Sequence, residues 1–151
     1  MISINIDDRL LRSFLHNLET AVPTIVADKT GNFIRERARE NVLPVKWRGN
    51  LHKSIVKSPA SGGKCRVEAT ESYAWRFEEK YKGFEKQSPL LLEWARDKGG
   101  SSLVRKTIRQ GGLNVDYSRK GSATEFMSKA SRLFDERQAT IYVEDAIKEV
   151  K

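Results

Sequence analysis

The chain has 151 residues, of which 38% are hydrophobic and 32% charged, and its formal net charge is +8. This length and composition fit one globular domain with its own core, so we expect residues 1–151 to form a single domain. The absence of any run of about 18 apolar residues excludes a membrane-spanning helix, the acidic pair Asp7 and Asp8 argues against a secretory signal, and the single cysteine excludes an internal disulfide and indicates a reducing compartment.

The first third of the chain is predicted to be helical. Residues 2–6 alternate isoleucine with polar side chains, as a short edge strand does, and Asp7 or Asp8 can cap the helix that follows. Pro23 predicts either a kink or the start of a second helix, because it lacks a backbone N–H. Gly31 weakens this helix by about 1 kcal/mol relative to alanine. One apolar stripe at helical spacing opens the segment: Leu11, Phe14, Leu15 and Leu18.

A β-hairpin is predicted after this helix. Pro44 ends the helix, and Arg48-Gly49-Asn50 turns the chain, with Gly49 free to adopt a positive φ. Leu51 and Ile55 lie on one side of a helical turn that leads into the first strand. The second strand is indicated by Cys65, Val67 and Ala69, which alternate with polar residues. Ser58 to Gly63 forms a loose tip between them, and Cys65 is predicted to be a small hydrophobic core residue.

Three aromatic residues follow the hairpin in alternation. Tyr73, Trp75 and Phe77 are separated by Ala74 and Arg76, which predicts a strand whose aromatic face packs against a helix. The alternative, a platform on which nucleic-acid bases stack, would need more basic neighbours than Arg76. Residues 79–87 are charged and predicted to be a turn.

The segment 88–121 is predicted to be a helical insertion within the domain. Ser88 caps a helix that has Pro89 at its first position, and Gly99-Gly100 ends it. Ser101 or Ser102 caps a second helix, which Gly111-Gly112 ends. Residues 113–121 lack periodicity and are predicted to be a long loop.

The C-terminal part is predicted to be one long helix. Ser122 or Thr124 caps it, and Glu125 places negative charge in its first turn. The β-branched content of residues 138–143 leaves a break into a strand as the alternative. The predicted fold is α+β: a small antiparallel sheet with a β-hairpin packed against a long N-terminal helix and a C-terminal helix, plus an inserted helical pair.

This order of elements resembles the neck and tail-completion proteins of long-tailed bacteriophages, which include minor tail components and head–tail joining proteins. The usual threonine before the turn glycine is Arg48 here, and the glycine after the acidic residue appears only at Gly83. The resemblance covers roughly residue 8 to the C-terminus. The matching residues, to which the resemblance assigns a structural role, are Pro44, Gly49, Leu51, Ser54, Ile55, Tyr73, Ala74 and Glu78.

The resemblance implies a structural virion protein and no enzyme. Such proteins form rings around the DNA channel between the head and the tail, and we expect a hexamer or dodecamer of this chain. The implied partners are further copies, the head-closure protein, the tail tube or tail terminator protein, and the genome DNA. The implied location is the virion, reached from the host cytoplasm, and the roles of neck spacer and tail terminator both stay open.

Positive charge is concentrated in two stretches. Residues 41–67 hold six basic residues and no acidic one, and residues 98–120 hold six basic residues and one acidic one. Such a field favours a polyanion or an acidic protein surface, although solvated loop charge is an equal alternative. The candidate residues for a DNA-channel wall or partner-docking face are Lys46, Arg48, Lys53, Lys57, Arg105, Lys106 and Arg109.

No catalytic, cofactor or metal site is predicted. His16 and His52 have no ligand at metal-binding spacing, and the three glycine pairs lack the Gly-Lys-Ser/Thr of a phosphate loop. Glu78 and Glu79 would point to opposite faces of a strand, so they cannot act as a carboxylate pair. The alternative function is a stand-alone basic nucleic-acid-binding module, although the sequence lacks a helix-turn-helix, zinc or RNA-reading signature.

Overall fold

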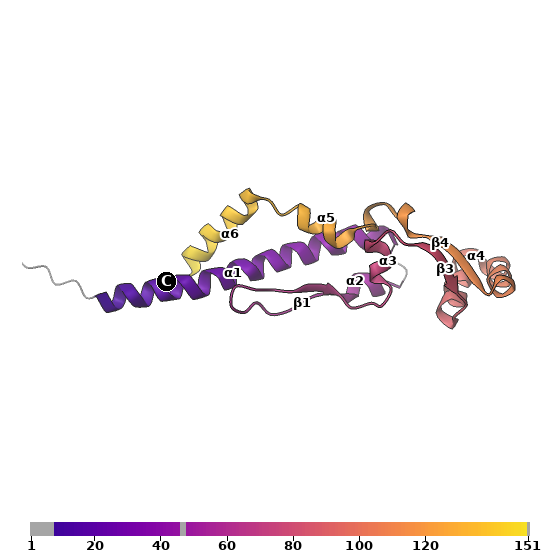
Figure 1. The fold of residues 1–151 in the computed structure, drawn as a ribbon, viewed down its shortest axis with the longest axis horizontal. Helices are drawn as coiled ribbons and strands as arrows, with labels where there is room; N and C mark the ends of the chain where they lie inside the picture. Colours follow the sequence, from indigo (N-terminus) through magenta and orange to yellow (C-terminus); the bar gives the residue numbers. More distant parts are fainter. Residues whose placement is uncertain (1–7, 46–47, 151) are drawn as a thin grey trace, which may run out of the picture.

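The computed structural model describes residues 8–45 and 48–150 and confirms the predicted α+β fold (Figure 1). The predicted edge strand at residues 2–6, the cap at Asp7 and the candidate Lys46 lie outside the described residues. The elements in chain order are α1 (Asp8–Val42), η1 (Leu43–Val45), α2 (Asn50–Ser54), β1 (Ile55–Lys57), β2 (Val67–Ala69), α3 (Ala74–Glu78), β3 (Lys82–Lys86), α4 (Pro89–Gln110), β4 (Gly112–Asp116), η2 (Tyr117–Arg119), η3 (Gly121–Ala123), α5 (Phe126–Arg132) and α6 (Glu136–Glu149).

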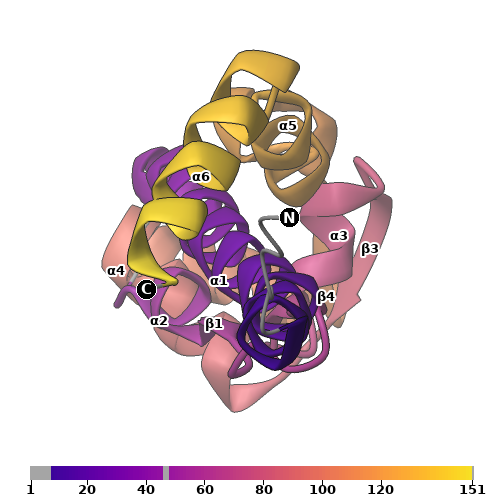
Figure 2. The same cartoon turned by 90° about the vertical axis from the view of Figure 1, so that its left-hand side faces the viewer.

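Helix α1 is the long axis of an elongated molecule. The α5 and α6 helices lie along one side of it and the β1–β2 hairpin along another, while the β3–α4–β4 unit extends from one end (Figures 1 and 2). Pro23 lies inside this one helix of 35 residues, so the alternative of a second helix starting there is wrong. The N-terminal end of α1 runs past both α6 and the hairpin, and its predicted apolar stripe is largely exposed rather than packed.

The main core lies where the C-terminal half of α1 meets the hairpin and α5. Its fully buried large side chains include Val42, Ile55 and Phe126. Arg39 fastens the first strand to the helix, because its guanidinium donates to the Ile55 carbonyl at 2.9 and 3.2 Å. Asn41 similarly donates to the Phe126 carbonyl at 3.1 Å. Polar groups at the end of α1 therefore tie three separate chain segments together.

The predicted hairpin is confirmed, with its lead-in helix. Gly49 has φ 71° in the turn, and the buried hydroxyl of Ser54 donates to the Leu51 carbonyl at 2.8 Å. The strands pair antiparallel, with Ile55 opposite Ala69. The second strand begins only at Val67, so Cys65 precedes it and is half-buried. The prediction of Cys65 as a core residue is therefore wrong.

The aromatic segment is a helix, α3, and the predicted strand there is wrong. A helical turn places Ala74 and Phe77 in the core and leaves Trp75 45% exposed. Tyr73 and Phe77 are four residues apart, so their rings meet on one side of the helix at a centroid distance of 6.4 Å. The alternation of three aromatic residues is thus no sign of a strand here, because a short helix buries Phe77 and leaves Trp75 exposed.

The unit β3–α4–β4, which we call the arm, corrects two predictions and confirms a third. Residues 82–86 form a strand rather than a turn, and residues 112–116 form its antiparallel partner rather than a loop. The helical pair between them is as predicted. Ser88 accepts a hydrogen bond from the Leu91 N–H at 3.1 Å, Gly100 breaks the helix with φ 58° and ψ −155°, and Gly111 ends it with φ 68°.

The C-terminal part is two helices, so the single long helix and its strand alternative are both wrong. Asp135 starts α6 by accepting from the Gln138 N–H at 2.8 Å. Neither Ser122 nor Thr124 caps α5. Instead, the Glu78 carboxylate of α3 accepts from the Met127 and Ser128 N–H groups, both at 3.0 Å. A residue almost fifty positions earlier therefore caps this helix.

The α3–α5 junction carries a second pair of charged groups. The Lys80 ammonium donates to the Glu125 carboxylate at 2.8 Å and lowers the pKa of that carboxyl group. Both residues have a positive φ, 53° and 54°, a conformation that side-chain-bearing residues adopt only when their surroundings hold them there. The junction is thus set by tertiary contacts rather than by local sequence.

Gly31 provides a test of the packing between α1 and the hairpin. A Cβ at this buried position would lie 2.5 Å from the Cys65 Sγ and 2.9 Å from the Lys57 Cδ. We expect Gly31→Ala to lower the free energy of unfolding by about 1 kcal/mol, because overpacking outweighs the gain in helix propensity. Urea unfolding monitored by circular dichroism measures the change. Gly31→Ala in a Cys65→Ala background should cost less, and equal losses in both backgrounds would contradict the contact.

Candidate functional site

The predicted basic residues within the described ranges fall into three groups. Two are paired with carboxylates, one is exposed by itself, and three share one side of a helix. Lys57 is only 10% exposed and pairs with Asp28 of α1, so little of its side chain is free to face a channel or a docking partner. Arg48 pairs with Glu93 on α4 and joins the turn before α2 to the arm. Lys53 is exposed on α2. The opposite charges that neutralise two of these residues lie 29 and 45 positions away, where no local pattern connects them.

The third group consists of Arg105, Lys106 and Arg109. Together with Ser102 and Gln110 they form one surface, which we call the basic face. These residues lie three and four positions apart in the second half of α4, so they share one side of the helix. They line a shallow depression of about 520 Å³. No carboxylate within the described ranges pairs with its three cations. Their spacing could have been recognised in the sequence, because the glycines at both ends already define the helix.

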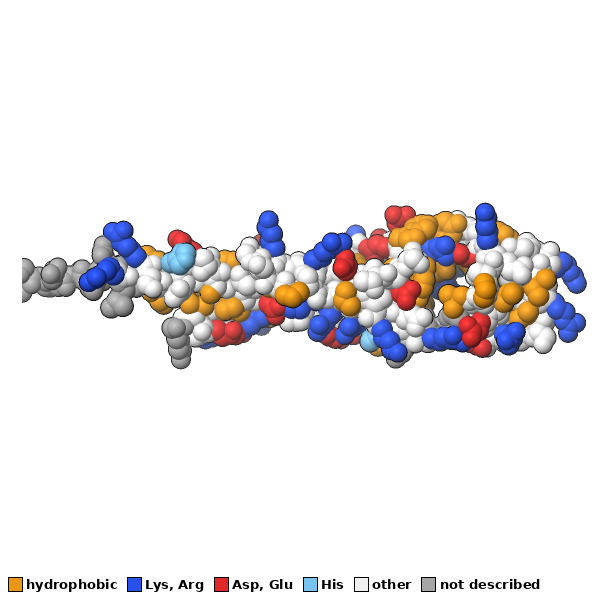
Figure 3. Space-filling model, turned by 90° about the horizontal axis from the view of Figure 1, so that it is seen from below, with side chains coloured by type: hydrophobic (Ala, Val, Ile, Leu, Met, Phe, Trp, Pro, Cys, Tyr) orange, Lys and Arg blue, Asp and Glu red, His pale blue; other side chains and the backbone are white. Residues whose placement is uncertain are grey.

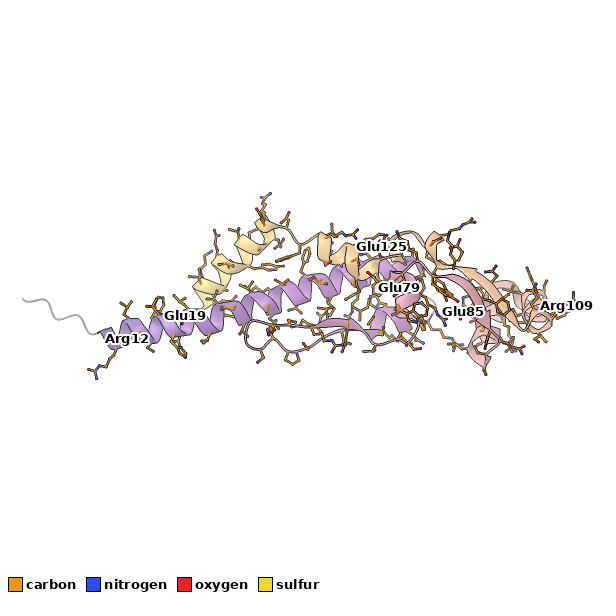
Figure 4. The ribbon with its side chains drawn as sticks, viewed as in Figure 1. Arg12, Glu19, Glu79, Glu85, Arg109 and Glu125 are labelled. Carbon is orange, nitrogen blue, oxygen red and sulfur yellow. The ribbon has the colours of Figure 1, made fainter. Side chains whose placement is uncertain are left out.

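The basic face lies at the far end of the molecule from the start of α1. Figure 4 shows Arg109 at the tip of the arm and Arg12 at the opposite end. Lys and Arg side chains also project from the arm end in the space-filling view (Figure 3). The tip of the arm therefore presents the three cations of the basic face well away from the main core.

An ion pair that the sequence did not reveal positions the arm. Arg76 of α3 donates to Glu85 of β3 at 2.5 Å, and their side chains are 29% and 15% exposed. The guanidinium also lies over the ring of Tyr81 at 5.8 Å. Tyr117 packs edge-on against Phe77 at 4.7 Å, and burial raises its pKa. These contacts join both ends of the arm to the core.

The chemistry of the basic face is that of anion binding. Two guanidinium groups and one ammonium group can pair with phosphates or carboxylates, and Ser102 and Gln110 add neutral hydrogen-bonding groups. In the part of the chain that the structure describes, no three His, Cys, Asp or Glu side chains gather as a metal site would require. No helix among the described residues has the length and apolarity to cross a bilayer.

Comparison with protein-family models, with curated proteins and with solved structures finds no match to this chain.

Proposed function

We propose that the protein is a structural component of the neck or tail end of a long-tailed bacteriophage. In this proposal it assembles as a ring around the DNA channel and joins or completes the tail at the interface with the head. The order of its sequence motifs motivates the proposal. The observation that carries it furthest is the basic face, which places three unpaired cations of the described structure at one extremity of an elongated subunit.

Ring symmetry would convert this modest charge into a strong field. Each copy contributes Arg105, Lys106 and Arg109, and rotation about one axis would bring the equivalent residues of every copy to the same height. A closed circle of cations then holds a polyanion without reading its sequence, because phosphate contacts are independent of base identity. The same face could instead dock onto an acidic surface of a neighbouring neck protein.

Charge reversal on the basic face tests the proposal. We expect Arg105→Glu with Arg109→Glu to weaken DNA binding strongly and to flatten its dependence on salt concentration, since about one phosphate contact is lost per arginine. The matched control is Arg132→Glu with Arg137→Glu, which makes the same change in net charge on α5 and α6. Filter binding across a salt series, combined with light scattering, measures affinity and oligomeric state together.

The ring and the stand-alone module predict different results. The ring proposal expects tight binding only in fractions that contain rings, formed alone or with the head-closure and tail tube proteins. A monomer that binds DNA as tightly as the assembled form would favour the stand-alone module. Equal effects of the two double variants would show that the basic face is not the site.

A further inference from the structure

The N-terminal end of α1 carries a row of apolar side chains, three of which are about half exposed. Leu11, Phe14 and Leu15 are 53%, 46% and 47% exposed, and Leu18 is half-buried. Their spacing of i, i+3, i+4 and i+7 is the one with which an amphipathic helix anchors in a hydrophobic groove. We call residues 11–18 the protruding segment, because they extend past α6 and the hairpin in Figure 1.

The face of α1 that carries these side chains is covered further along the helix. Lys29 pairs with Glu149 of α6 at 2.6 Å, and the ring of Phe33 meets that of Phe134 at 5.8 Å. Both α1 residues continue the direction of the stripe at helical spacing. The α6 layer therefore ends before the stripe does, and among the described residues no other element packs against the protruding segment.

A groove of matching character lies on a different side of the molecule. Its floor is a row of α1 residues, Pro23, Ala27 and Thr30, and its volume is about 760 Å³. The tip of the hairpin, including Lys64 and Cys65, forms one wall. The α5 helix forms the other wall, with Met127 and Ser131. Small side chains on the floor allow another helix to approach α1 closely.

The protruding segment cannot enter the groove of its own chain. Residues 11–18 and the floor residues 23–30 belong to one continuous helix, which holds them in line. We propose that the protruding segment of one copy binds in the groove of the next copy. This inference rests on the proposed ring for its setting and names the contact that would build it.

Charge favours a second copy as the occupant. Glu19 flanks the stripe, four residues after Leu15, and the wall of the groove carries Lys64, so docking would bring opposite charges together. Four apolar side chains bury much less than the roughly 1,600 Å² of a standard stable interface. One such contact is therefore weak, but each copy offers one segment and one groove. The contact is head-to-tail, and a closed ring would hold every copy twice.

Disulfide trapping tests this contact, because the only natural cysteine of the chain lies in the groove wall. We expect at least one of Leu11→Cys, Leu15→Cys and Leu18→Cys, each made singly in the full chain, to join Cys65 of a neighbouring copy under mild oxidation. The product should be a ladder of dimers, trimers and higher species on a non-reducing gel. Wild-type protein and Ser13→Cys, on the opposite side of the same helix, should stay monomeric on that gel.

The pattern of products decides the outcome. Dimers alone that persist after Cys65→Ala would indicate pairing between two protruding segments and overturn the head-to-tail contact. The absence of any species beyond those of wild type and Ser13→Cys would overturn it as well. DNA binding lost through the Arg105 and Arg109 changes, with no ladder from any segment variant, would refute this inference and leave the proposed function standing. A ladder without DNA binding would support this contact and overturn DNA as the ligand of the basic face.

Discussion

Replacing Glu78 by alanine should lower the free energy of unfolding by about 2–3 kcal/mol, since the change removes three charge-assisted hydrogen bonds, two of them from the backbone at the start of α5. The Glu78 carboxylate accepts from two backbone N–H groups at 3.0 Å and from the Ser128 hydroxyl. Without it, the first turn of α5 keeps no side-chain cap, because Glu125 at the cap position makes no such bond. Urea unfolding gives the change from the midpoint and slope.

The neighbouring carboxylate supplies a matched control. Glu79 is exposed, and Figure 4 shows it beside the same helix. We expect Glu79→Ala to change stability by less than about 0.5 kcal/mol, as surface substitutions usually do. Glu78→Gln keeps one acceptor oxygen and should fall between the two. Equal losses from Glu78→Ala and Glu79→Ala would show that the carboxylate does not hold α5.

Gly112→Ala should disrupt the arm. A Cβ at this position would lie 2.0 Å from the Glu85 carbonyl oxygen, and the residue has φ 154°. Because the obstacle is backbone, β3 and β4 would have to separate, at a cost of about 3–5 kcal/mol from overpacking and conformational strain together. The basic face depends on this pairing for its position, so DNA binding should fall with it.

Hydrogen exchange can localise that effect. Amides of the β3–β4 pair, such as Leu113, should lose protection in Gly112→Ala while those of β1 and β2 keep theirs. Gly111→Ala is the control, since its Cβ would meet open space and only the φ of 68° is unfavourable, at about 1 kcal/mol. Loss of protection throughout the chain would mean that the arm and core unfold as one unit.

Local chemistry explains which elements the sequence could predict. Gly49 turns the chain, Ser88 and Pro89 start a helix, and Gly111 ends it, because each feature depends on the backbone preferences of one or two residues. The strand at Lys82–Lys86 has no such signal. Its one large apolar side chain, Phe84, is 50% exposed, and its pairing partner lies about thirty positions away.

The candidate site divides in the same way. Arg105, Lys106 and Arg109 share a helix, so their common face follows from spacing alone. The neutralisation of Lys57 by Asp28 and of Arg48 by Glu93 follows from how α1 and α4 pack against distant segments. The net charge of a stretch of sequence therefore overestimated the charge available at the surface, because the sequence does not show which distant carboxylates pair with its basic residues.

The length of the continuous helix α1 sets how far its N-terminal apolar side chains lie from the core. Its 35 residues span about 52 Å, at 1.5 Å per residue. Each residue gained or lost near its start would alter its reach by one such step and rotate the apolar side chains by about 100°. The length of the helix and the direction in which its apolar side chains face therefore change together. Seven residues, close to two full turns, is the smallest change in length that nearly keeps that direction.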